Sequence, residues 1–172
     1  MTIIVAFSGY LITYFISIFI EIRKAKLQFI SDQIQYLYGP LFALGDASNQ
    51  AWLSFRSKCR PGGSFFGRNP PPSEDELKQW RLWMTEVFMP INLKIEKTIV
   101  ENAHLINGSG MPKEFRDVLV HVEAYKTTIK KWEEEDFTNH VSYNNYPRSF
   151  LNSVSHTYAD LKKKQAKMIG MK

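Results

Sequence analysis

The first hydrophobic pattern in the chain is an uncharged, largely apolar run from residue 3 to residue 20. As a helix, these residues would extend about 27 Å, which is close to the thickness of about 30 Å of a bilayer's hydrocarbon core. Arg23, Lys24 and Lys26 follow directly. Because basic residues beside a span are retained on the cytoplasmic side, the pattern predicts a transmembrane anchor in residues 1–26, with the amino terminus outside.

Two other interpretations of this run were weighed against an anchor. A secretory signal peptide would have basic residues before the apolar stretch and a small-x-small cleavage pattern after it, and neither is found. A buried core helix would fit the length, which is at the lower limit for a span. The larger polar intrusions are Tyr10 and Tyr14, and the remaining small polar residues are tolerated in membranes, so the pattern favours an uncleaved anchor.

Beyond residue 26, apolar residues recur every three or four positions, which is the helical period. The first stripe runs from Leu27 to Phe55, and we expect its helix to kink or restart at Gly39-Pro40. Residues 60–72 are rich in glycine and proline and lack both the Walker and the G-x-G-x-x-G spacings. This composition predicts a linker or mobile flap and not a nucleotide-binding loop.

Ser73 and Glu76 have the spacing of a capping box, which predicts a well-defined helix start. The helix that follows should bend or divide at Pro90. Two further helical stripes begin at Pro112 and Pro147, on either side of an irregular segment rich in asparagine, residues 137–146, which we call the Asn-rich segment.

No run of the chain alternates with the period of a strand. The sequence therefore predicts an all-α fold, in which an amino-terminal single transmembrane helix is followed by a four- or five-helix cytosolic bundle in residues 27–172.

Three segments resemble the recurring segments of a family of small bacterial proteins with an amino-terminal span and a helical domain. They are WRLWMTEVFMPIN (Trp80 to Asn92), ENAHLI (Glu101 to Ile106) and HVEAYKTTIKKWEEEDF (His121 to Phe137). The resemblance extends over most of Gln28 to Ile169. It implies a location in the bacterial inner membrane and an all-helical fold. It implies no activity, substrate or catalytic residue, because that family is uncharacterised.

The net charge of +5 is unevenly distributed, with basic clusters after the apolar run and at the end of the chain. The basic residues that we expect to face lipid are Arg23, Lys24, Lys26, Lys162, Lys163 and Lys164. Each basic residue near an anionic leaflet contributes about 1 kcal/mol of binding, although solvated helix ends explain such clusters equally well. The sequence contains no helix-turn-helix, zinc-finger or RNP signature, which argues against nucleic acid as a partner.

Candidate chemistry is sparse. Glu101 and His104 form a Glu-x-x-His pair with the spacing used in di-iron helical bundles, which need two such pairs and two further carboxylates. The nearest substitutes are Asp117 with His121 and His156 with Asp160, so the prediction is at most a degenerate metal site, and plain solvated side chains are the competing interpretation.

We interpret Cys59 as an ordinary thiol: its neighbours Lys58 and Arg60 could lower its pKa, but no base can be paired with it to make a nucleophile. We expect no catalytic residues and no organic cofactor. The sequence thus favours a membrane-anchored interaction module that binds an unknown protein or its own copies, with Trp52, Trp80, Trp83 and Trp132 available for interfaces or for packing. The alternative is a membrane-tethered metal-binding protein or enzyme that uses Glu101 and His104.

Overall fold

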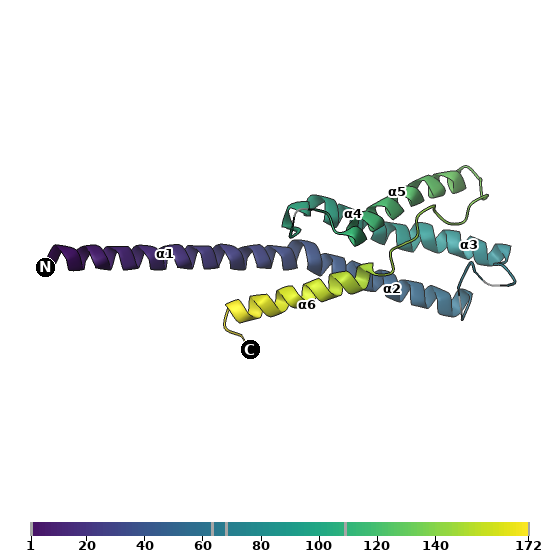
Figure 1. The fold of residues 1–172 in the computed structure, drawn as a ribbon. Coiled ribbons are helices and arrows are strands. Elements are labelled where there is room, and N and C mark those ends of the chain that lie inside the picture. The colour runs from purple at the N-terminus through teal and green to yellow at the C-terminus, as the bar shows by residue number, and fades with distance from the viewer. Residues whose placement is uncertain (1, 63, 68, 109, 172) are drawn as a thin grey trace.

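The computed structural model describes residues 2–62, 64–67, 69–108 and 110–171, with side chains from residue 9 onward. Within these ranges the protein is all-helical and contains no strand, which confirms the all-α part of the predicted fold class. The elements are α1 (Thr2–Asp32), η1 (Gln33–Tyr38), α2 (Gly39–Cys59), α3 (Glu74–Trp83), η2 (Met84–Phe88), α4 (Met89–Glu101), η3 (Ala103–Leu105), α5 (Lys113–Glu133) and α6 (Phe150–Met168). The first half of α1 projects from one end of the bundle that the other helices form (Figure 1).

Both helices that contain an internal proline continue through it. A π-helical segment precedes each proline, and in each the residue before the proline bonds five residues back: the Gly39 N–H donates to the Ile34 carbonyl, and the Met89 N–H donates to the Met84 carbonyl. In a regular α-helix the ring of a proline collides with the carbonyl four residues before it. The wider π turn provides room for the ring, so the helix does not restart at Pro40 and does not divide at Pro90.

The start of α3 is as the sequence predicts. The Ser73 hydroxyl accepts a hydrogen bond from the Glu76 N–H at 3.3 Å, and the Glu76 carboxylate accepts one from the Ser73 N–H at 2.7 Å. Arg60 donates to the same Glu76 carboxylate at 2.8 Å. The capping box is therefore confirmed, and it also ties the beginning of α3 to the end of α2.

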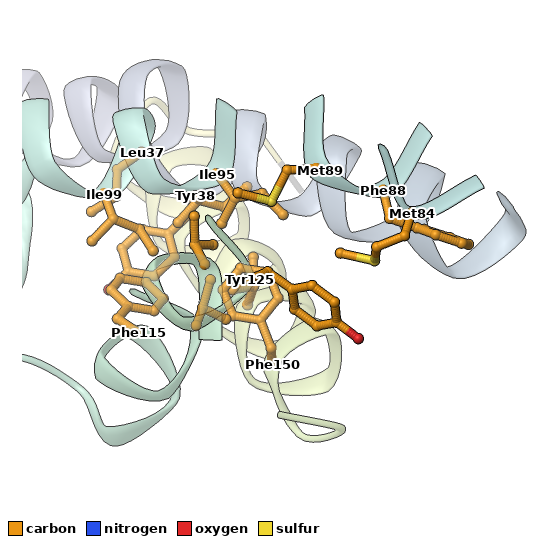
Figure 2. Packing of buried hydrophobic residues seen from close by; sticks show 14 of the residues in the cluster. Leu37, Tyr38, Met84, Phe88, Met89, Ile95, Ile99, Phe115, Tyr125 and Phe150 are labelled. Atoms are coloured by element: carbon orange, nitrogen blue, oxygen red, sulfur yellow. The ribbon is translucent and has the colours of Figure 1, made fainter. Parts of the chain in front are cut away.

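Buried apolar side chains of several helices pack together in the core, part of which Figure 2 shows. The core continues into an aromatic cluster between α2 and α3. Phe55 is fully buried at the centre of that cluster, 5.3 Å from Phe65, 5.8 Å from Trp80 and 5.4 Å from Trp83 between ring centroids. Since rings at such separations contribute packing beyond their area, this cluster fixes α2 against α3.

Two irregular segments are held against the bundle by specific side chains. The Gly/Pro-rich segment, expected to be a linker or flap, inserts Phe65, which is only 2 % exposed. The Asn-rich segment accepts hydrogen bonds on its backbone carbonyls: Trp80 Nε1 donates to His140 at 2.6 Å and Trp132 Nε1 donates to Asn139 at 2.8 Å. These contacts satisfy the indole N–H groups of two largely buried tryptophans.

Across the part of the chain that the structure describes, no helix is both long enough and apolar enough to cross a membrane. The expected span of residues 3–20 begins with side chains 3–8, which lie outside the described part.

Candidate functional site

The carboxyl-terminal half of the expected span is exposed on all sides of α1. The large apolar side chains between residues 10 and 22 are at least 36 % exposed, and Phe15 and Phe19 reach 64 % and 67 %. They are Tyr10, Leu11, Ile12, Tyr14, Phe15, Ile16, Ile18, Phe19, Ile20 and Ile22. A helix that is apolar all round belongs in an apolar environment, because contiguous exposed apolar surface of this kind is rare on a soluble monomer.

Two basic clusters that are far apart in the sequence lie close together at the base of this apolar segment. Arg23 donates a hydrogen bond from Nη2 to the Met168 carbonyl at 2.6 Å, and Gln165 Nε2 donates to Ser31 Oγ at 3.0 Å. These two bonds place α6 beside the second half of α1, as Figure 1 shows. The guanidinium of Arg23 thereby satisfies a carbonyl at the end of α6, where the helix dipole favours positive charge.

We call Arg23, Lys24, Lys26 and Lys167 the basic collar. All four side chains are exposed. Lys24 also forms an ion pair with Glu21 at 3.0 Å, and because both partners are highly exposed, this pair leaves the charge of the collar available to other anions.

Lys162, Lys163 and Lys164 of the predicted lipid-facing set lie further back on α6 than Lys167. Lys164 and Lys162 precede Met168, whose carbonyl Arg23 contacts, by four and six residues, about 6 and 9 Å along a helix. All three lysine side chains are exposed. They therefore lie within about two helical turns of the basic collar.

The candidate metal pair does not share a regular helical turn. Helix α4 ends at Glu101, and His104 lies in the short η3 that follows. Both side chains are exposed, and the Glu101 carboxylate is 3.7 Å from Lys97 Nζ. Among the described residues, no group of three or more His, Cys, Asp or Glu side chains could hold a metal ion.

The suggested substitutes are also engaged elsewhere. Asp117 pairs with Lys113 at 2.5 Å, whereas the buried His121 contacts the Asn144 carbonyl through Nδ1 at 2.6 Å. His156 and Asp160 face each other at 3.5 Å on an exposed turn of α6. The geometry therefore brings neither pair to Glu101 and His104 as a common ligand set in the described structure.

Burial shifts the pKa of Cys59 and of His121. It raises the pKa of the Cys59 thiol, and the Glu76 carboxylate raises it further, against a smaller lowering by Lys58. The net shift is upward, opposite to the lowering that the flanking basic residues suggested, so the protonated thiol is favoured. Burial also lowers the pKa of His121, so its imidazole is neutral at physiological pH.

Sequence reasoning missed a polar cluster inside the bundle. Asn92 is only 2 % exposed, and its Oδ1 accepts no hydrogen bond from the described residues. His121 and Tyr125 are likewise buried and line the same cavity as Asn92. Each of these residues lies on the inward face of a helix, where the helical spacing predicts ordinary apolar core. The sequence signal for a polar cluster was the presence of Asn and His at these inward positions.

A scan of the chain against protein-family models gave no match, and searches of curated proteins and of solved structures found nothing significantly similar. The resemblance carried by the three segments above therefore remains a prediction.

Proposed function

We propose that this protein is a membrane-anchored interaction module, in which residues 3–20 cross the bilayer and the helical domain binds a protein partner or a second copy at the cytosolic face. The observation that carries the proposal is the all-round exposure of apolar side chains on the projecting half of α1. Contact with lipid tails would remove these side chains from water without requiring any matching surface on another protein.

The basic collar supports the proposed orientation. Arg23, Lys24 and Lys26 follow the apolar segment within one helical turn or two, and Lys167 joins them from α6. At the cytosolic surface of a membrane these side chains would meet the phosphates of anionic lipids, each with about 1 kcal/mol of attraction. The resemblance to membrane-anchored bacterial proteins supports the inner membrane as the location.

A groove between α4 and α5 supports the protein-binding part of the proposal. Val100 and Val120 are 60 % and 50 % exposed beside one another in its lining, and Glu96 and Glu123 flank them. Apolar residues bordered by charge are typical of the centre and rim of a transient protein interface.

The orientation is tested by labelling engineered cysteines in intact bacterial cells. In a Cys59→Ser background, Thr2→Cys should react with a membrane-impermeant maleimide, whereas Met171→Cys, which replaces a side chain 65 % exposed, should react only after the cells are lysed. Equal reactivity of both positions before lysis, or protection of both after it, would refute the single-span topology.

The interaction is tested with a photo-crosslinking amino acid at position 120, and with the same amino acid at position 82 as control. Both positions carry apolar residues that are about half exposed, but Leu82 lies on α3, away from the groove. A crosslinked species of defined mass from position 120 alone identifies a partner or a dimer. Identical product patterns from the two positions would contradict the assignment of the groove.

A further inference from the structure

A cavity of about 980 Å³ opens between α2, η2, α4, α5 and the Asn-rich segment. Its wall is largely aromatic and includes Trp52, Phe65, Trp80 and Phe88. The volume is at the upper end of the range for pockets that bind small molecules, about 300 to 1,000 Å³. Glu101, His104 and the residues of the basic collar lie outside the lining of this cavity.

Polar atoms without protein partners occur at this cavity. Asn92 lines it while being 98 % buried, and neither its Oδ1 nor the Tyr146 hydroxyl, which also lies in the lining, has a hydrogen-bond partner among the described residues. Buried polar groups are nearly always satisfied, and an unsatisfied one calls for a water molecule or a ligand. The Asn92 Oδ1 accepts, so the group that satisfies it must carry an N–H or O–H donor.

The ionisable residues of the cavity select for negative charge. Arg56 and Arg148 are both part of the lining, and no described residue of the lining is an aspartate or glutamate. The Arg56 guanidinium lies against two of the aromatic rings, 5.7 Å from the centroid of Trp52 and 5.6 Å from that of Phe65. Arg148 is exposed at the rim, where it can meet an anionic group that enters from solvent.

His121 adds a second acceptor. The Asn144 carbonyl can only accept, so His121 Nδ1 carries the proton in their contact of 2.6 Å. A neutral imidazole with its proton on Nδ1 has a lone pair on Nε2. The cavity therefore combines flat apolar walls, acceptors among its buried residues and a cation at its rim.

From these groups we propose that the cavity binds a flat, mostly apolar organic anion, an aromatic carboxylate that also carries one O–H or N–H donor. The aromatic rings take the flat body, Arg148 takes the carboxylate, and Asn92 takes the donor. The site is independent of the proposed membrane anchoring.

The position of the cavity favours a water-soluble ligand over a lipid. Trp52 follows Ile20 by 32 residues on one continuous helical track formed by α1, η1 and α2, which corresponds to about 48 Å. Figure 1 shows the aromatic end of the bundle, where α2 meets α3, far from the projecting half of α1. If residues 3–20 cross the bilayer as proposed, a lipid would have to leave it completely to reach the cavity.

The test measures the binding of three related probes to the full-length protein in phosphatidylcholine nanodiscs by isothermal titration calorimetry, with empty nanodiscs as the reference. The probes are 6-hydroxy-2-naphthoate, 6-methoxy-2-naphthoate, which lacks the donor, and 2-naphthylmethylammonium, which reverses the charge. We expect the hydroxy acid to bind at least tenfold more tightly than either of the others. Equal affinity for all three, or no binding of the hydroxy acid, would overturn the proposal.

Two variants assign the preferences to residues. Asn92→Leu should abolish the preference for the hydroxy over the methoxy acid, and Arg148→Gln should abolish the preference for the anion over the cation. Arg116→Gln removes an exposed arginine outside the cavity lining and should retain both preferences. If Asn92→Leu does not fold, the Arg148→Gln variant still tests the proposal, because Arg148 is exposed. An unchanged preference for the anion over the cation in Arg148→Gln would refute the site.

Discussion

Replacing Ile12 with arginine provides the sharpest test of the membrane anchor. Ile12 is 60 % exposed, so the change removes no contact from the helical core. It lies at the middle of residues 3–20, where a charge is furthest from either bilayer surface. Any effect of Ile12→Arg should therefore come from transfer into the membrane and not from the stability of the bundle.

The expected magnitude follows from the composition of the span. Eleven Ile, Val, Phe and Leu side chains in residues 3–20 contribute about 0.3 to 0.6 kcal/mol each, or about 3 to 7 kcal/mol in total, and the Ser, Thr, Gly and Tyr residues reduce this. Arginine at the centre costs about 2.5 to 3.5 kcal/mol, so the exchange removes about 3 to 4 kcal/mol. At tenfold per 1.4 kcal/mol, the ratio of membrane-inserted to non-inserted protein should fall by roughly several hundredfold.

The assay is extraction of bacterial membranes with alkaline carbonate, which releases peripheral proteins and leaves spanning ones in the pellet. The wild type and Leu82→Arg, a charge introduced at an equally exposed site on α3, should stay in the pellet, whereas Ile12→Arg should appear in the supernatant or be degraded. Retention of Ile12→Arg in the pellet at the wild-type level would refute the reasoning that residues 3–20 cross the bilayer.

Three further predictions concern the domain. Gly39→Ala should lower the free energy of unfolding by about 1 to 3 kcal/mol in chemical denaturation, because a Cβ at this position would come within 3.0 Å of the Ile34 carbonyl oxygen in the π segment. A variant as stable as the wild type, or more stable, would contradict this steric argument. Ser73→Ala should cost about 1 kcal/mol through loss of the cap, while Ser57→Ala, which lacks a capping role, should cost less. Burial lowers the pKa of His121 in the folded state, which therefore favours the neutral ring, so the contribution of His121 to stability should be full above the unfolded pKa of about 6.5 and decline as the pH falls below it. A pH titration of the melting temperature checks this. If a His121→Gln variant showed the same acid-induced decline, His121 would be excluded as its source.

Local chemistry was predictable wherever a few adjacent residues determine it. The capping box at Ser73 and the helical period of the core depend on spacing alone, and both appear in the structure. The path through Pro40 and Pro90 was not predictable in the same way. Proline excludes the regular α-helical turn, but it does not specify whether a kink, a break or a π turn replaces it.

The candidate site was also only partly predictable from the sequence. The apolar run and the basic residues after it are contiguous in sequence, so the anchor and its flank could be proposed before the fold was known. That Lys167 joins them, with Lys162, Lys163 and Lys164 within two helical turns of it, depends on how α6 returns along α1, which the sequence does not encode locally. The cavity around Asn92 was invisible for the same reason, because it draws its lining from helices and loops across the whole domain.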